Sequence, residues 1–327
     1  RTGMKLRHAL LGICVIAIST VLVPTAAAQH WPAQPIRVIV PFPPGGGTDI
    51  LARLMAPKLF ALLGQQIIVE NKPGASSIIG SQLVARSAPD GYTLLISDST
   101  FFINPGLRSD LPYDTLKDFE PVIHLAVGPV ILVANPSFPA TTVAELVAQA
   151  KAHPGTLFYG SGAIGSPTQL AGELFNLATG VKISAVPFKG TGDVFAAVVA
   201  NHVPLTFTGI SSARPAIEGG QLRALAITGD RRNAAVPNVP TFVEAGVTGV
   251  DSSTHWIFVA PAKTPRSVVL ALNAAMNKVL ADPEIKTRIA GLGYDPVGGS
   301  PDDAASFTRN EIAKWTRVIR AAHISTP

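Results

Sequence analysis

Short apolar runs and longer amphipathic stretches alternate along this chain. Apolar runs of five or six residues bounded by Gly, Ser or Pro predict strands, and apolar positions spaced by three or four residues predict helices. The first third of the chain has strands over 36–40, 67–71 and 92–97, with helices near 49–63 and 77–87 between them. This order is typical of an α/β fold with a parallel sheet covered on both faces.

The same pattern starts again further along the chain. Strands are predicted over 130–135, 157–162, 182–188, 203–209 and 222–228, and helices over 142–152, 166–180, 191–200 and 211–219. A further strand at 255–262 is followed by helices near 265–291 and 301–322. Two units of one kind, each expected to hold a parallel sheet, predict a protein of two lobes.

The order of these units predicts where the lobes divide. We expect the chain to cross between the lobes at about 125–132 and to return at about 252–258, so that two crossing strands form a hinge. The tail helices would then pack on the first lobe. Lobe 1 is therefore expected to comprise residues 29–130 and 253–327, and lobe 2 residues 131–252.

Residues 1–28 have the pattern of a secretory signal peptide. A basic start over Met4–Arg7 precedes an apolar run, Ala9–Val23, and small residues end the segment at Ala28. A membrane anchor is the alternative, but the run has fifteen residues, whereas a span needs roughly 20. We expect cleavage after Ala28 and a location in the periplasm.

The excess of positive charge falls once this segment is removed. The full chain carries 26 basic and 21 acidic residues, and residues 1–28 hold three of the basic ones and no acid, which leaves a net charge of +2. With no basic run besides, the sequence does not indicate a nucleic-acid partner. The single cysteine, Cys14, lies in the apolar run, so the mature sequence has no thiol for a disulfide, a nucleophile or a metal.

The turns that lead from strands into helices are the candidate binding positions. In open parallel sheets, ligands bind where the carboxyl ends of strands meet helix N-termini, whose free N–H groups attract anions. Six such turns are rich in Gly, Ser and Thr and poor in Lys and Arg: 41–49, 71–80, 97–105, 159–169, 187–194 and 207–215. They offer backbone N–H groups and hydroxyls, which suit a carboxylate recognised without a salt bridge. From these turns we take Ser76, Ser77, Asp98, Ser99, Lys189, Thr208 and Ser211 as candidate ligand-binding residues.

The first turn, PFPPGGGTD, is the most distinctive of the six. Gly and Ser punctuate ordinary α/β turns, because they tolerate positive φ and cap helices, but the three glycines Gly45–Gly47 expose more backbone than a turn requires. The motif is not a P-loop, since no Gly-Lys-Ser/Thr follows, and Ile50 stands where a dinucleotide fingerprint needs its third glycine. The histidines show no ligand spacing, so we expect no metal and no cofactor.

One segment resembles the motif of a serine hydrolase. Gly209–Ala213 follows a strand, starts a helix and is one substitution from the G-x-S-x-G nucleophile elbow around Ser211. Asp230 or Asp251, followed by His255, would complete the Ser, Asp, His order. Because the final glycine is missing, we favour a helix cap or a ligand donor at Ser211 and keep an esterase as the alternative function.

Several segments together resemble the Bug family, periplasmic receptors of tripartite tricarboxylate transporters. They are VPFPPGGGTDILARLMAPKL, VENKPGASSIIGSQLVARSAPDGYTLL, LPYDTLKDFEPV, GSPTQLAGELF, VPFKGTG and TPRSVVLALNAAMNKVLADPEI, and they extend over essentially the whole mature chain. The resemblance implies a Venus-flytrap fold that binds a small organic carboxylate (a di- or tricarboxylate or an aromatic acid) between its lobes. It also implies delivery to the membrane subunits of a transporter by a protein that is not an enzyme, and we expect a monomer.

The resemblance assigns ligand contacts to two of the turns. In the first turn it implies Phe42 as an apolar wall, together with Gly46 and the backbone N–H groups of Gly47, Thr48 and Asp49. In the fourth turn it implies Ser161, Gly162, Ser166 and Thr168.

The chain departs from the family pattern at three positions that bear on the ligand. Gln169 stands where members often have His, and Asp98 and Asp193 add acids near the turns. An added acid repels a plain dicarboxylate unless it faces solvent or binds an amino group. A receptor of the same fold that feeds a sensor kinase is the remaining alternative to transport.

Overall fold

The structure is a computed structural model that describes residues 31–162, 165–188 and 191–324. Residues 34–327 form one compact unit. The expected signal peptide and the candidate residue Lys189 lie outside the described residues.

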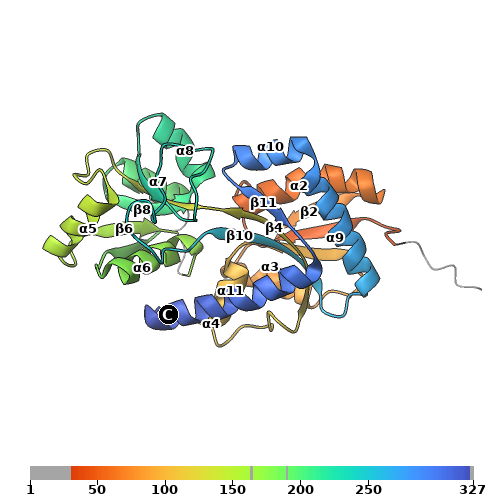
Figure 1. Ribbon diagram of the computed structural model, residues 1–327. Coiled ribbons are helices and arrows are strands. Elements are labelled where there is room, and N and C mark those ends of the chain that lie inside the picture. Colours follow the sequence, from red (N-terminus) through yellow and green to blue (C-terminus); the bar gives the residue numbers. More distant parts are fainter. Residues whose placement is uncertain (1–30, 163–164, 189–190, 325–327) are drawn as a thin grey trace, which may run out of the picture. The chain divides into compact units, whose positions relative to one another are not determined.

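The first sheet is built from both ends of this unit. Its strands lie in the order β11-β4-β10-β3-β1-β2. They are β1 (Ile36–Val40), β2 (Ile67–Asn71), β3 (Thr93–Ser97), β4 (Phe119–Gly128), β10 (Thr254–Pro261) and β11 (Asp295–Gly298). The helices α2 (Gly47–Leu63), α9 (Arg266–Ala281) and α10 (Pro283–Gly291) lie on one side, and α3 (Ile78–Ala85), α4 (Thr100–Leu107) and α11 (Pro301–Ala321) on the other (Figure 1).

The second sheet is built from the middle of the chain. Its strands lie in the order β7-β6-β8-β5-β9. They are β5 (Val130–Ala134), β6 (Phe158–Ser161), β7 (Ser184–Pro187), β8 (Leu205–Gly209) and β9 (Arg223–Ile227). The helices α5 (Val143–Ala152) and α6 (Pro167–Thr179) pack in one apolar cluster with this sheet, and α7 (Thr191–Val199) and α8 (Ile210–Glu218) pack in another.

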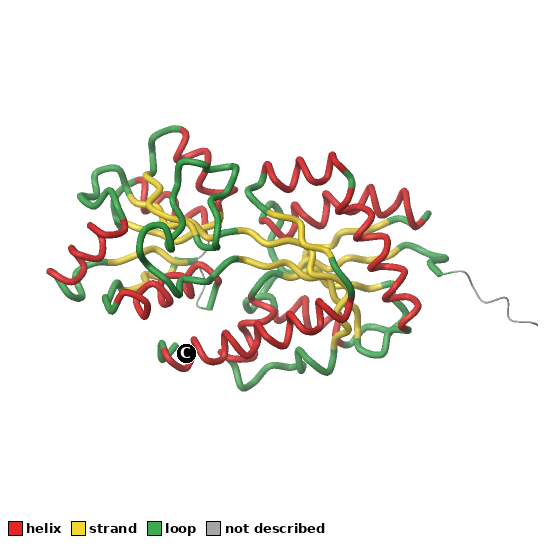
Figure 2. Tube along the Cα trace, in the orientation of Figure 1, coloured by secondary structure: helices red, strands yellow, loops and turns green. Residues whose placement is uncertain are grey.

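The expected parallel pairing is right for the strands between helices and wrong for the strands that enter each sheet. β1 pairs in parallel with β2 and β3, and β6 with β7 and β8. β5 pairs antiparallel with β8 and β9, and β10 antiparallel with β3 and β4. The reason is the direction of the crossing: β5 enters the second sheet and β10 re-enters the first, so each runs against neighbours that point toward the other sheet. Figure 2 shows the two crossing segments that run between the sheets.

Both crossings lie close to their expected places and beside each other. β4 ends at Gly128 and β5 begins two residues later at Val130. On the return path, Thr254 pairs with Gly128. Two adjacent strands therefore connect the sheets, as the two α/β units predicted.

The tail differs from the expected pair of helices. The stretch expected as one helix over 265–291 is divided, because α9 ends at Ala281 and α10 begins at Pro283. The Asp282 side chain accepts a hydrogen bond from Glu284 N (2.9 Å), and Pro283 lacks the N–H that a continuous helix needs. The next segment, for which no element was predicted, forms β11 at the sheet edge.

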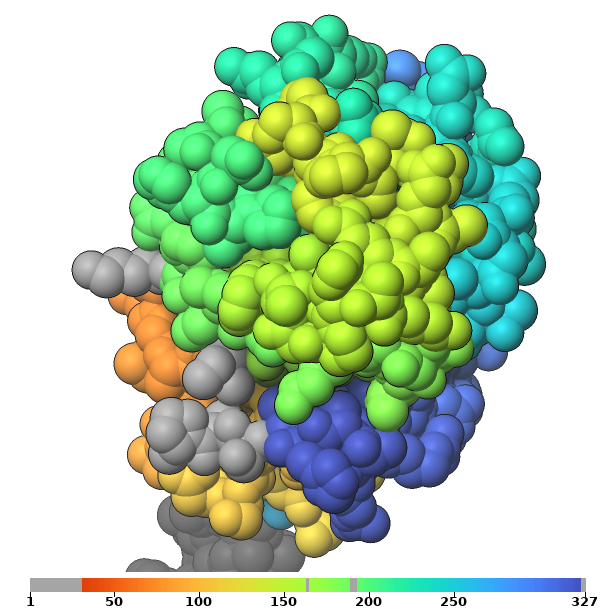
Figure 3. Space-filling model, turned by 90° about the vertical axis from the view of Figure 1, so that its left-hand side faces the viewer, coloured from red at the N-terminus to blue at the C-terminus, as the bar shows by residue number. Residues whose placement is uncertain are grey.

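We call each sheet with its covering helices a unit, the first and the second. Apolar packing fills each unit and also joins the two. The first unit's core includes Phe101, Ile257 and Trp315, and Leu170 of α6 packs in the same cluster. In the space-filling view, the end of α11 (blue) lies beneath the second unit (green) (Figure 3). Within the described part of the chain, no helix is long and apolar enough to cross a membrane.

Candidate functional site

The strand directions bring the candidate turns to facing edges of the two sheets. β1, β2 and β3 run in the same direction as β4, which leaves toward the second sheet. β6, β7 and β8 run against β5, which arrives from the first sheet. The turns that follow β1, β2, β3, β6, β7 and β8 therefore all lie at the edges where the chain crosses, which is where ligands bind in folds of this type.

The first turn presents the beginning of α2 without a side-chain cap. The helix starts at Gly47, and the N-cap residue, Gly46, is exposed and has no side chain to accept a hydrogen bond. Gly45 has φ +87°, a conformation that favours glycine. Free N–H groups at a helix start attract anions, so this turn keeps the property that the sequence predicted.

The Asp49 carboxylate holds the first turn in shape. It accepts hydrogen bonds from Gly45 N (2.9 Å), Asn71 Nδ2 (2.9 Å) and Arg53 Nε (3.0 Å), and Asn71 also donates to Phe42 O (3.0 Å). Burial opposes ionisation of Asp49, but these hydrogen bonds and the charge of Arg53 outweigh it and lower the pKa. The side chain of Asp49 is thus a structural element of the turn.

Replacing Asp49 with Asn is expected to lower the free energy of unfolding by about 1–3 kcal/mol, the usual range for hydrogen bonds to a charged group. Chemical denaturation of both proteins at pH 7 measures this difference. Because the folded pKa is lowered, the contribution is present above the unfolded pKa and is lost as the pH falls through the folded value, so the difference should narrow in acid. The exposed Asp110, which pairs with Arg108, provides the control Asp110→Asn. Equal losses in both variants would contradict the role of Asp49.

Two buried aromatic residues connect the first turn to the second sheet unit. Trp256 Nε1 donates to Thr48 Oγ1 (3.0 Å), and the Trp256 ring lies 4.4 Å from that of Tyr294. The Tyr294 hydroxyl is 2.9 Å from Ser211 Oγ in the first turn of α8. A Cβ on Gly47 would lie 2.7 Å from the Tyr294 hydroxyl, so this position has room only for glycine.

The second and third turns of the first unit are held by their own polar groups. Ala75, Ser76 and Ser77 all have positive φ (48°, 50° and 74°), an uncommon run for residues with side chains. Asn104 Nδ2 donates to Ser76 O (2.9 Å) and fixes the turn. The Ser99 hydroxyl accepts from His255 N (2.9 Å), which commits Ser99 to the fold.

Asp98 differs from these serines because part of its carboxylate is not used. Thr100 donates to Asp98 Oδ1 from its N (2.8 Å) and from its hydroxyl (2.6 Å), while Oδ2 has no hydrogen-bond partner among the described residues. Burial raises the pKa of Asp98. Burial, and after it the charge of Asp98, raises the pKa of Tyr294. This acid therefore lies near the aromatic pair, whereas Asp193 is exposed.

The turns of the second unit bring three candidate residues together. Gly162, Thr168 and Thr208 line a cavity of about 10 Å³, which is room for about one water molecule. Ser166 caps α6 by accepting from Gln169 N (3.3 Å), and its hydroxyl is 3.0 Å from that of Thr168. Ser161 is buried at the end of β6.

Four residues that support the candidate turns were not predicted from the sequence: Trp256, Tyr294, Asn71 and Asn104. Trp256 lies in a strand that was predicted, and a large aromatic at a crossing point was the available signal. Tyr294 follows a helix in a segment for which no element was predicted. No pattern in the sequence indicated that the two rings meet, because their contact depends on the return of the chain into the first sheet.

The hydrogen bonds of Ser211 and His255 do not form the pair that an esterase requires. Ser211 bonds to Tyr294, whereas His255 Nδ1 lies 3.1 Å from His124 Nε2. Asp251, one of the expected acids, contacts Lys314 (3.4 Å). Among the described residues, no group of three or more His, Cys, Asp or Glu side chains is placed to hold a metal.

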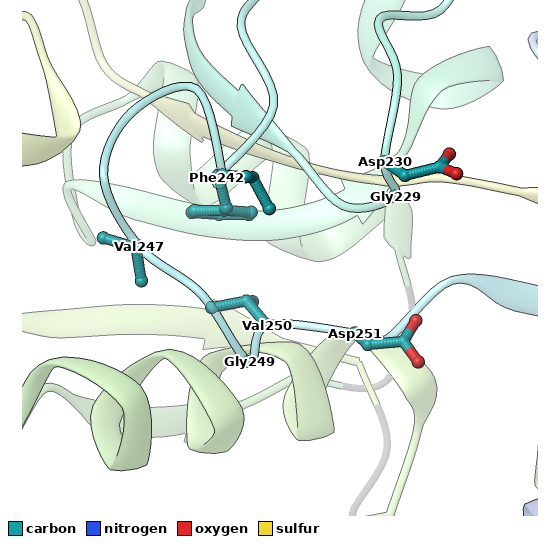
Figure 4. Close-up of a pocket in the computed structure, with 8 residues that line it drawn as sticks. Gly229, Asp230, Phe242, Val247, Gly249, Val250 and Asp251 are labelled. Carbon is teal, nitrogen blue, oxygen red and sulfur yellow. The ribbon is translucent and has the colours of Figure 1, made fainter.

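A larger cavity of about 410 Å³ lies in the second unit and contains none of the candidate ligand-binding residues. Phe242, Val247 and Val250 line it, and Asp230 and Asp251 point the same way at one end (Figure 4). Because its charged lining residues are these two acids, it lacks the anion-binding features of the turns.

Two α/β units joined by adjacent crossing strands, with the candidate turns at facing edges, are typical of a two-lobed binding protein. Residues 51–324 match the TctC family, the tripartite tricarboxylate transporter family receptor. BugT of Bordetella pertussis is 37% identical over 314 residues, which cover 95% of this chain and 96% of BugT. The chain belongs to this receptor family, which confirms the resemblance read from the turns.

Solved structures support the same fold. R. palustris Rpa4515 with adipate is 36% identical, with a TM-score of 0.83 over 90% of this chain and 99% of that one. MatC from Rhodopseudomonas palustris with bound malate is 33% identical, with a TM-score of 0.79 over 88% of this chain and all of that one. The expected periplasmic-binding-protein fold is confirmed.

Proposed function

We propose that this protein captures a small organic carboxylate between its two units and delivers it to the membrane subunits of a tripartite tricarboxylate transporter. The observation that carries the proposal is the uncapped start of α2 at Gly47, which faces the crossing edge beside neutral hydroxyl donors. Neutral donors hold a carboxylate without the cost of desolvating a cation. The adipate and malate bound to the two solved relatives support this class of ligand.

The proposed mechanism is closure of lobe 1 (29–130 and 253–327) on lobe 2 (131–252) about the two crossing strands. A ligand that contacts turns of both lobes stabilises the closed arrangement through contacts that the open one lacks. We also propose export to the periplasm with removal of residues 1–28, which the intact mass of exported protein would test.

Asp98 supports a narrower ligand class within this function. A carboxylate with one oxygen unused accepts a hydrogen bond from a ligand hydroxyl or amino group, and its charge repels a second ligand carboxylate placed there. We propose that the ligand carries such a donor besides its carboxylate.

Native mass spectrometry of protein purified from a periplasm, followed by calorimetric titration, tests the function. The titration panel should include adipate, malate and succinate, because malate and succinate differ only by a hydroxyl. We expect one carboxylate to bind one to one, and malate to bind more tightly than succinate. In Asp98→Asn this preference should shrink while binding persists. No binding by the wild type across a broad carboxylate panel would contradict the proposed function.

A further inference from the structure

The Tyr294 hydroxyl lies where the first turn (41–49), which we call the ligand turn, meets α8 of the second unit. Tyr294 is 5% exposed, and its ring packs at a tilt of 40° against that of Trp256, which is 4% exposed. Its hydroxyl lies against Gly47 and 2.9 Å from Ser211 Oγ. One phenol therefore contacts both the start of α2 and the start of α8.

Several other contacts follow the same line between the units. Asn233 Nδ2 donates to Gly293 O (3.0 Å) in a buried position. Arg231 Nη2 lies 3.2 Å from Asp295 Oδ2 in an ion pair. A Cβ on Gly293 would lie 2.8 Å from Ile210 Cγ2, so the backbone of the first unit touches α8 directly. We name residues 210–211, 231 and 233 together with 293–295 the Tyr294 seam.

The contacts of the seam join two units, whereas other contacts of the ligand turn lie within the first unit. Thr48 and Trp256 both belong to the first unit, so their hydrogen bond persists when the units move relative to each other. Ser211 and Tyr294 belong to different units, so a separation of the units that moves α8 away from Tyr294 breaks their hydrogen bond. The Tyr294 ring thus stays packed on Trp256, while the hydrogen bond of its hydroxyl to Ser211 can form and break.

We propose that Tyr294 is a positioning residue for ligand capture. Its hydroxyl stabilises the closed arrangement by bonding to Ser211, and its ring limits how closely the first turn approaches at Gly47. The inference rests on the proposed carboxylate-binding function. A ligand that draws the units together forms the Tyr294–Ser211 bond, and the bond in turn delays ligand release. Loss of the hydroxyl acts on the closed state alone, because Tyr294→Phe keeps the ring on Trp256.

The first test is a double-mutant cycle on the carboxylate that the wild type binds. Tyr294→Phe and Ser211→Ala are each expected to weaken affinity about fivefold to tenfold through faster dissociation, as loss of one hydrogen bond implies. The double variant should be no weaker than either single one. The controls are Tyr159→Phe, a buried tyrosine bonded within the second unit, and Ser212→Ala, the exposed neighbour of Ser211. Unchanged affinity in both test variants, or additive losses, would overturn the proposal.

A second test needs no ligand and separates this inference from the proposed function. The mature chain has no cysteine, so Arg231→Cys with Asp295→Cys gives one unambiguous pair across the seam. The rate of joining by a short bismaleimide reagent reports how often the seam is closed. Tyr294→Phe in this background should slow the reaction severalfold, and equal rates would overturn the proposal. A wild type that binds no carboxylate would defeat the proposed function, while the reaction rates still decide the role of Tyr294.

Discussion

Replacing Gly47 with Val is expected to weaken carboxylate binding at least about tenfold, or roughly 1.4 kcal/mol of binding free energy. A Cβ at this position would lie 2.7 Å from the Tyr294 hydroxyl and 3.1 Å from Trp256 Cζ2. A branched side chain must therefore displace the aromatic pair or the start of α2, and it also covers the N–H groups offered to the ligand. Isothermal titration of the bound carboxylate measures the loss.

Gly291→Val is the matched control for this substitution. Gly291 is the exposed last residue of α10, outside the candidate turns, and a Cβ on it would meet no atom within 4 Å. The control should therefore fold and bind as the wild type does. If Gly47→Val kept the wild-type affinity, the first turn would not be the ligand site.

Acidification from pH 7 to pH 4 is expected to remove about 3 kcal/mol or more of stability through His124, which is buried, and His255, which is partly buried. His124 of β4 and His255 of β10 contact each other, and the ring of Phe307 stacks on His124 at 4.0 Å. Burial lowers the pKa of His124 to about 4. Burial, followed by the charges of His124 and Lys314, lowers the pKa of His255 to about 3.

The direction of the effect follows from which state binds protons. Below pH 6.5 the unfolded chain protonates these histidines, whereas the folded protein keeps them neutral until about pH 4. The unfolded state therefore binds more protons in this window, and stability falls as the pH falls. A lowering of about 2.5 pKa units on His124 alone corresponds to roughly 3 kcal/mol. Because the two groups titrate as a pair, the contribution of His255 does not simply add.

Urea unfolding at several pH values between 7 and 5 measures the slope of the unfolding free energy against pH. This window lies above the range in which most carboxylates titrate. The double variant His124→Gln/His255→Gln should have a smaller slope of unfolding free energy against pH. The decrease should correspond to about two protons, because neither Gln titrates. His202→Gln removes an exposed histidine and should leave the slope close to that of the wild type. A double variant with the full wild-type slope would contradict the role of the pair. Since both histidines lie on crossing strands, this sensitivity belongs to the part of the fold that connects the two units.

The sequence by itself determined the local elements and the turns between them. The strands over 36–40 and 67–71, and the glycine-rich start of α2, agree with the structure closely. These features depend on apolar spacing and on the backbone freedom of Gly, both of which are written into neighbouring residues. The two crossings were also predicted, because the α/β pattern stops and starts again at 130.

Only the tertiary structure decided how the entering strands pair and which side chains meet at the turns. The bond between Thr48 and Trp256 joins residues 208 positions apart, and that between Ser211 and Tyr294 joins residues 83 apart. No local spacing encodes such contacts, because they form only after β10 has returned between β3 and β4. The turns were therefore readable from the sequence, whereas the aromatic pair that connects them had to be observed in the fold.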